Sequence, residues 1–164
     1  MNRDRFLIGI LIGIGILAAL TVVRVLTYSP AEMTYGEDAT PQGVVHNYIV
    51  AIYRGEYEKA YSYLADKEQK PSLDAFRRSF LMGIMDNTKN MMAQVGRAEI
   101  VDGKEARVEV SIIYASSDPF SGSYSNIQYA ILVRQGEAWK IEFMPYPFWD
   151  GSWYTPEIMP PPKD

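Results

Sequence analysis

The chain has 164 residues, 48% of them hydrophobic, and a formal net charge of −4 at pH 7. It contains no cysteine, which excludes disulfide bonds, thiol catalysis and metal sites with cysteine ligands. Beyond the N-terminal segment, the pair Arg77-Arg78 is its one cluster of basic residues, so nucleic acid is not an expected ligand. We also expect no cofactor and no metal ion.

The first predicted element is an apolar helix. Residues 6–23, FLIGILIGIGILAALTVV, carry no charge, and the apolar run continues to residue 28 with Arg24 as its single interruption. A helix over residues 6–28 would be about 34 Å long, which exceeds the roughly 30 Å of a bilayer's hydrocarbon core. Arg24 lies near one end, where its long side chain can reach the headgroups. The sequence therefore predicts that residues 1–28 comprise a short N-terminus and a transmembrane anchor.

The charges beside this run predict its orientation. Arg3 and Arg5 precede it, whereas Glu32, Glu37 and Asp38 follow it and no basic residue occurs before the next predicted helix. Basic flanks stay in the cytoplasm, so we expect a single-pass protein of the cell membrane whose C-terminal domain lies outside the cytoplasm. A cleaved signal peptide is the alternative, although the run is longer than the roughly 7 to 15 residues typical of such peptides.

A linker and three helices are predicted next. Residues 29–40 are polar, contain proline and glycine and show no periodicity, as expected of a linker. Thr40 and Pro41 suit the N-cap and first position of a helix, Gly55 separates that helix from a second one, and Ser72 suits the N-cap of a third. Each helix carries an apolar stripe at helical spacing, so each has a face to bury.

After residue 90 the apolar period changes from 3.6 to 2, which predicts strands. Four strands are expected in MAQVGRAEI, EARVEVSIIYAS, YSNIQYAILVR and AWKIEFM, with a tight hairpin turn at Asp102-Gly103. In the second strand, Val108, Val110, Ile112 and Tyr114 alternate with polar residues and are expected to face the core. In the third strand, the residues expected to face the core are Ile127, Tyr129, Ile131 and Val133. Three helices followed by an antiparallel meander predict an α+β domain, in which the helices bury their stripes on the concave face of a curved sheet.

Short motifs in these elements resemble a known superfamily. Residues 54–57, Arg-Gly-Glu-Tyr, and KAYSYL at residues 59–64 resemble the opening helices of nuclear transport factor 2-like proteins, the superfamily of ketosteroid isomerase and scytalone dehydratase. GEAWKI at residues 136–141 resembles their closing strand. The resemblance runs from about residue 40 to residue 143 and implies a cone-shaped fold, which is an architecture rather than an activity. We expect the domain itself to span residues 41–154, with an aromatic C-terminal extension after the last strand. The proline-rich residues 155–164 are expected to form a disordered tail.

The interior of such a cone is the first candidate site. In enzymes of this superfamily, Asp, His and Tyr side chains inside the cone carry the reaction, but no motif places such a set on this sequence, so we expect no catalytic residue. Buried phenolic hydroxyls need hydrogen-bond partners, which either a ligand pocket or a filled core would supply. The candidate pocket-lining residues are Tyr48, Ile52, Tyr61, Phe80, Tyr114, Tyr129 and Trp139.

The segment after the last strand is the second candidate site. MPYPFWDGSWYTPEIMPPPKD combines prolines with aromatic residues, so it is neither a regular helix nor a free tail. One interpretation is that it folds back over the domain as a lid, with its tryptophans packed against the domain. The other is an exposed aromatic surface for a partner or for the membrane interface. The candidate residues are Tyr146, Phe148, Trp149, Trp153 and Tyr154.

These features favour a non-catalytic, membrane-tethered binding or accessory module outside the cytoplasm. One alternative is a small-molecule enzyme of isomerase, dehydratase or hydrolase type that uses tyrosine-assisted acid/base chemistry inside the cone. Another is a structural domain of the cell envelope that dimerises through the outer face of its sheet. The expected partners are the membrane through residues 6–28, a small apolar ligand, and a second copy of the chain or an envelope protein. Arg77-Arg78 fit either a solvated helix face or a contact with acidic lipid or cell-wall polymer.

Overall fold

The computed structural model describes residues 13–17, 33–84, 91–115, 123–151 and 153. The chain divides into two compact units, Met1–Met33 and Thr34–Asp164. In the first unit, residues 13–17 are helical and exposed. Among the described residues, no helix is long and apolar enough to cross a membrane. Most of the predicted span at residues 6–28 lies outside the described residues, so the membrane anchor stays a prediction.

The second unit begins with short helices, whose predicted start signals are confirmed. Helix α2 spans Pro41–Tyr53, and its N-cap Thr40 accepts a 3.1 Å hydrogen bond from the Gly43 amide. Gly55, with a φ of +70°, separates it from α3 at Tyr57–Ser62. Helix α4 spans Leu73–Ser79 and continues as the π-helical turn η2 at Phe80–Ile84. The side chain of Ser72 caps α4 by accepting a hydrogen bond from the Ala75 amide.

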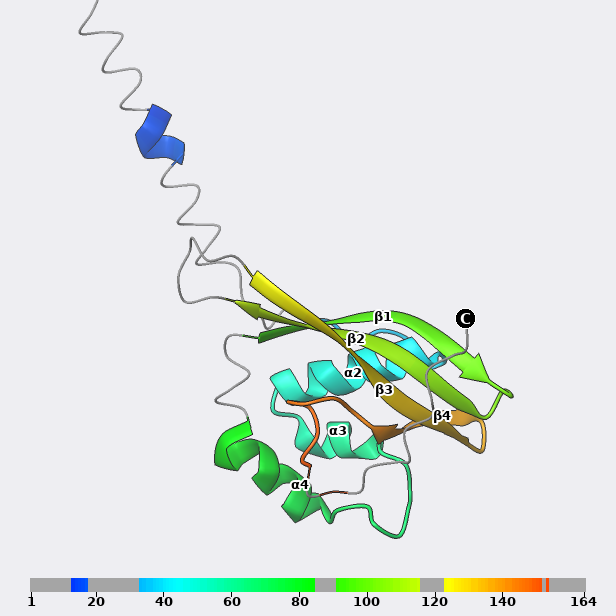
Figure 1. Cartoon of the computed structure of the whole chain (residues 1–164). Helices are drawn as coiled ribbons and strands as arrows, with labels where there is room; N and C mark the ends of the chain where they lie inside the picture. Colours follow the sequence, from blue (N-terminus) through cyan, green and yellow to red (C-terminus); the bar gives the residue numbers. More distant parts are fainter. Residues whose placement is uncertain (1–12, 18–32, 85–90, 116–122, 152, 154–164) are drawn as a thin grey trace, which may run out of the picture. The chain divides into compact units, whose positions relative to one another are not determined.

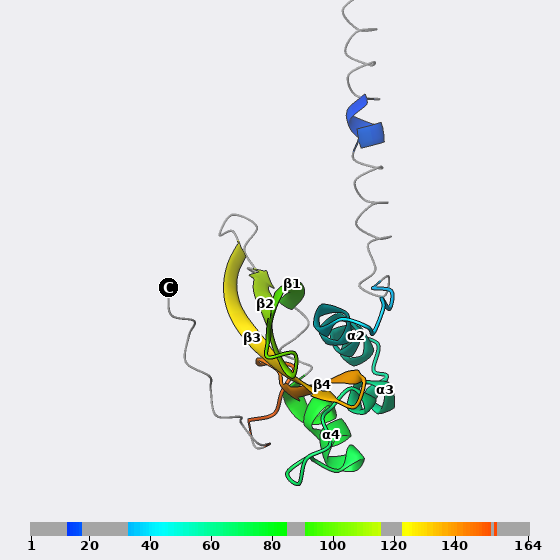
Figure 2. The ribbon, with the colours of Figure 1, turned by 90° about the vertical axis from the view of Figure 1, so that its right-hand side faces the viewer.

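Four antiparallel strands form one sheet in the order β1-β2-β3-β4, which confirms the predicted α+β meander (Figure 1). The strands are β1 at Met91–Val101, β2 at Glu105–Ala115, β3 at Ser123–Gln135 and β4 at Ala138–Phe143. The turn between β1 and β2 places both Asp102 and Gly103 at positive φ, as expected of an Asp-Gly hairpin. In Figure 2 the sheet curves, and α2, α3 and α4 lie on one side of it.

The free edge of β4 is paired with the chain that follows α3. Leu64 forms an isolated parallel bridge with Ile141. The Ile141 amide donates to the Tyr63 carbonyl and the Ala65 amide donates to the Ile141 carbonyl, each at 2.8 Å. The link between helices and sheet is therefore made of backbone hydrogen bonds as well as apolar packing.

The predicted core face is right for β2 and wrong for β3. Val108, Val110 and Ile112 of β2 are fully buried, as expected. In β3, however, Ala130 and Leu132 are buried, whereas Tyr129 is 42% exposed. Residues 129–133 are apolar without interruption, so alternation does not distinguish the two faces. The register decides: Ala130 lies opposite Val108, and Leu132 lies opposite the buried Ala106, so the even-numbered residues share the core face.

Candidate functional site

The concave side of the sheet is filled by side chains. Four of the seven predicted pocket residues, namely Tyr48, Ile52, Phe80 and Trp139, are buried in one apolar cluster with residues of α2, β2 and the C-terminal segment. Tyr61 and Tyr114 are half-buried and pack against this cluster. Tyr129 lies on the opposite face of the sheet, which corrects its predicted place in the interior.

The hydroxyls of three interior tyrosines bond to backbone carbonyls. Tyr48 donates to Phe148 at 2.7 Å, Tyr53 to Met91 at 3.1 Å, and Tyr61 to Pro71 at 2.8 Å. Burial raises the pKa of Tyr48 well above its ordinary value, and burial also raises the pKa of Tyr53. The raised pKa values keep Tyr48 and Tyr53 in the neutral form as hydrogen-bond donors, which is a structural use of the phenol.

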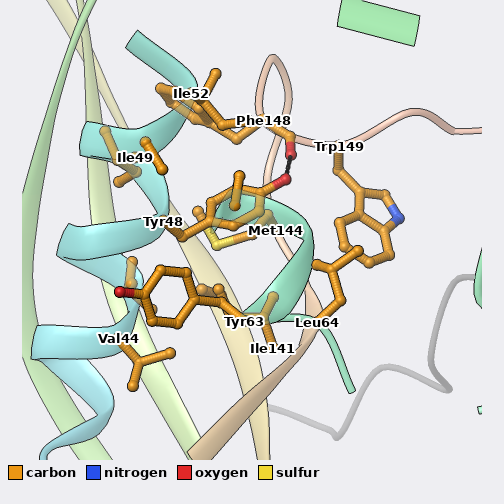
Figure 3. Packing of buried hydrophobic residues seen from close by; sticks show 14 of the residues in the cluster. Val44, Tyr48, Ile49, Ile52, Tyr63, Leu64, Ile141, Met144, Phe148 and Trp149 are labelled. Atoms are coloured by element: carbon orange, nitrogen blue, oxygen red, sulfur yellow. Dashed lines mark hydrogen bonds between the residues drawn. The ribbon is translucent and has the colours of Figure 1, made fainter. Parts of the chain in front are cut away.

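The C-terminal segment packs into the domain (Figure 3). Phe148, Trp149 and Trp153 are buried, and the Tyr48 ring lies between α2 and this segment. The Trp153 ring stacks on Phe76 of α4 at 5.2 Å between centroids, and Trp149 meets Trp153 edge to face at 4.9 Å. The packing expected of both tryptophans is thus confirmed, and these indoles do not form an exposed aromatic surface. Tyr146 is exposed, and Tyr154 lies outside the described residues.

A second segment, which we call the N-terminal strap, comprises residues 34–40 and is bonded to the helices. Asn47 of α2 is buried, and its side-chain amide accepts from the Gly36 amide at 2.7 Å and donates to the Gly36 carbonyl at 2.9 Å. Asn47 also donates to Asp38. Half-buried His46 lies with Nε2 2.9 Å from the Thr34 carbonyl. Residues 34–40, predicted as part of a linker, are therefore docked on the domain.

Two tyrosine–carboxylate pairs complete the contacts of the strap. Tyr35 donates to Glu56 at 2.7 Å, and Lys59 lies 3.2 Å from the centroid of the Tyr35 ring. Tyr63 donates to Asp38 at 3.3 Å. Burial, followed by the Glu56 hydrogen bond, raises the pKa of Tyr35 to about 12, and burial together with the Asp38 charge raises that of Tyr63 to about 12. Both phenols stay protonated at neutral pH, which suits a structural donor better than an acid catalyst.

Sequence reasoning missed the strap because its signal is tertiary. The residues that hold it belong to α2, α3 and their connections, and each has an ordinary helical or loop context in the sequence. The strap lies close to α2 at Gly43. A methyl group at this position would overlap the Glu37 carbonyl oxygen, so this close contact requires glycine. Within the described part of the chain, no group of three or more His, Asp or Glu side chains is arranged to hold a metal ion.

The outer face of the sheet carries exposed apolar side chains. The register places Ser111 opposite Ile127, Glu109 opposite Tyr129, and Arg107 opposite Ile131, so these residues share one face. Ile127 is 60% exposed, and Met92 of β1 is also exposed. The Arg107 guanidinium lies 5.2 Å from the Tyr129 ring centroid. We define the outer sheet face by Met92, Ile113, Ile127, Tyr129 and Ile131; no described helix covers it (Figure 2).

Comparison with known proteins gives structural likenesses only. No protein-family model matches the chain, and no curated protein matches its sequence. Among solved structures, a SEC-C motif containing protein from Rhodopseudomonas palustris is similar with a TM-score of 0.45 and 12% identity, covering 65% of this chain and 77% of that one. An NTF-2 like protein of unknown function from Shewanella oneidensis gives a TM-score of 0.43 and 10% identity, over 60% of this chain and 88% of that one.

A ketosteroid isomerase-like protein from Erwinia carotovora atroseptica is similar with a TM-score of 0.44 and 13% identity, covering 66% of this chain and 92% of that one. The similar structures thus include proteins described as NTF-2 like and as ketosteroid isomerase-like. Likenesses at these scores assign neither an activity nor a ligand to the chain, and its own residues carry the functional argument.

Proposed function

We propose that the chain is a non-catalytic binding module, tethered to the cell membrane by residues 6–28, with its folded domain outside the cytoplasm. The proposed binding role rests on where the domain's aromatic and apolar side chains lie. The chain's own C-terminal segment occupies the concave side of the sheet, where the Tyr48 hydroxyl is bonded to the Phe148 carbonyl. Exposed apolar side chains lie instead on the outer sheet face. This arrangement favours recognition at the surface over chemistry in the interior.

The tether and its orientation rest on the apolar run and its flanking charges. A reporter that is active only outside the cytoplasm, fused after Asp164, is expected to be active, and the protein is expected to remain in the membrane fraction after alkaline washing. An inactive reporter would reverse the proposed orientation. A soluble product whose N-terminus lies near Glu32 would replace the anchor with a cleaved signal peptide.

The outer sheet face favours one second candidate, a domain that dimerises through its sheet. Ile127 and Tyr129 are exposed apolar residues flanked by polar ones, the mixture found in interfaces that are not permanently closed. Sedimentation of the full chain in detergent is expected to give a dimer that Ile127→Glu converts to a monomer. Asn126→Glu, on the same strand but on the opposite face of the sheet, is the matched control, because Asn126 is exposed and lies outside the outer sheet face. If the wild-type chain sediments as a monomer, the dimer candidate is wrong and the outer sheet face would have to bind a different partner.

A further inference from the structure

Exposed apolar and basic side chains lie close together where α4 continues into the turn η2, and we call this region the tip. Phe76 and Phe80 of this segment are fully buried, and they fix which side faces the core. The two residues after Phe80 are exposed, Leu81 by 62% and Met82 by 83%. Large apolar side chains scattered singly on a surface are common, but Leu81 and Met82 are adjacent and form an exposed apolar pair.

Arginines lie one turn before this apolar pair. Arg77 and Arg78 are both exposed and are four residues before Leu81 and Met82, so each arginine lies near one of the apolar residues on the outward side. Arg77 lies 3.6 Å from Glu58, with both side chains more than half exposed, and such a pair contributes little and exchanges readily. Arg78 donates to the Asp74 carbonyl, which leaves the Asp74 carboxylate as an acidic neighbour of this surface.

We infer that this tip, formed by Arg77, Arg78, Leu81 and Met82, docks into the surface of a phospholipid bilayer that carries anionic headgroups. Leu81 and Met82 enter the boundary between headgroups and acyl chains, and the two guanidinium groups bind phosphates. The tip is a pair of adjacent exposed apolar residues with two exposed arginines one turn before them. A small apolar patch with basic neighbours suits an anionic bilayer surface, whereas a protein groove that binds a helix reads apolar residues repeated along a stripe. The inference rests on the proposed membrane tether.

The tether makes a weak docking site effective. The predicted span ends at residue 28 and the compact unit begins at Thr34, so about 20 Å of extended chain at most joins them. A domain held this close meets the bilayer at high effective concentration, and a small apolar contact then suffices to orient it. Docking would give the domain a defined face toward the membrane and leave the outer sheet face for a partner.

The absence of cysteine makes a direct test possible in the full chain. Met82→Cys, labelled with an environment-sensitive fluorophore, is reconstituted into vesicles of phosphatidylcholine or of phosphatidylcholine with phosphatidylglycerol. Lys104→Cys, in the exposed β1–β2 turn, is the matched control. We expect the probe at position 82 to emit at shorter wavelength in the anionic vesicles and to be quenched by nitroxide-labelled lipid, while the probe at position 104 stays aqueous. Adding Arg77→Gln and Arg78→Gln should reduce the shift at position 82.

The outcomes separate this inference from the tether. If the chain floats with the vesicles but the probe at position 82 stays aqueous in both lipids, the docking inference is overturned and the tether stands. A shift without quenching by lipid nitroxides points to a protein contact and also overturns the inference. A chain that does not float overturns the proposed tether, and the docking inference with it.

Discussion

The Tyr48 hydroxyl donates a 2.7 Å hydrogen bond to the Phe148 carbonyl, one hundred residues further along the chain. Both residues are buried, so neither group has bulk water as an alternative partner. This bond joins α2 to the C-terminal segment at the centre of the domain (Figure 3). It makes the segment after β4 part of the core and ties α2 to that segment.

Tyr48→Phe removes this hydrogen bond while keeping the ring. The Phe148 carbonyl is then left buried without its partner, so we expect the free energy of unfolding to fall by about 1 to 3 kcal/mol. Urea unfolding measures the change. Tyr124→Phe, at an exposed position, is the control and should change stability by no more than about 0.5 kcal/mol. Equal effects of the two variants would show that the bond to Phe148 does not stabilise the fold.

Trp153→Ala tests the packing of the C-terminal segment. Trp153 stacks on Phe76 and meets Phe80 and Trp149 edge to face, so truncation leaves a cavity among these three rings. We expect a loss of about 3 to 5 kcal/mol, measured by thermal and urea unfolding. Glu137→Ala, in the exposed β3–β4 turn, should be nearly neutral. If Trp153→Ala were equally neutral, the segment would not be an energetic part of the domain.

Asn47→Ala tests the attachment of the N-terminal strap. The substitution removes both hydrogen bonds to Gly36, and we expect it to cost about 1 to 3 kcal/mol. Faster hydrogen–deuterium exchange should be confined at first to residues 34–40, because the strap would open before the core. Asn126→Ala, at an exposed position of β3, serves as the control. Unchanged exchange in the strap would contradict the structural role of Asn47.

Gly43→Ala tests whether helix propensity or the contact between Gly43 and the strap has the larger effect on stability. Alanine is a better helix former than glycine by about 1 kcal/mol, so helix propensity alone predicts stabilisation. The added methyl group would overlap the Glu37 carbonyl oxygen, so we expect the strap to be displaced and the domain to be destabilised. Hydrogen–deuterium exchange of residues 34–40 measures the displacement of the strap, and urea unfolding measures the loss of stability. Gln42→Ala is the neighbouring control. A more stable Gly43→Ala variant would show that the strap yields at little cost.

The raised pKa values of Tyr35 and Tyr63 predict an alkaline limit to stability. Both are about 12 in the folded domain against an ordinary value of 10.0, so folding favours the neutral phenols. Their contribution is therefore fully present below pH 10 and is lost as the pH rises through about 12. Urea unfolding across this range should show a decline in stability that is shallower in the Tyr35→Phe, Tyr63→Phe double variant. An identical decline in both proteins would assign the alkaline limit to other groups.

Local features were predictable from the sequence because their causes lie within a few residues. The caps Thr40 and Ser72 bond to amides three residues away, and the Asp102-Gly103 turn needs positive φ at both positions. The core face of β2 was also predictable, because polar residues alternate with Val108, Val110 and Ile112. The helices and strands, and hence the α+β class, were predictable from such local signals.

Tertiary structure decided which surfaces face which partners. Tyr129 lies in an uninterrupted apolar run, so only the register with β2 placed it outside. In the sequence, Asn47 is a single polar residue in a predicted helix, and no spacing or motif predicts its hydrogen bonds to Gly36 of the strap. Whether the aromatic segment packs or stays exposed depended on the rings that the helices offer it: Phe148 meets Tyr53 of α2, and Trp153 stacks on Phe76 of α4. Side-chain burial is a property of the assembled layers, whereas caps and turns are properties of neighbouring residues.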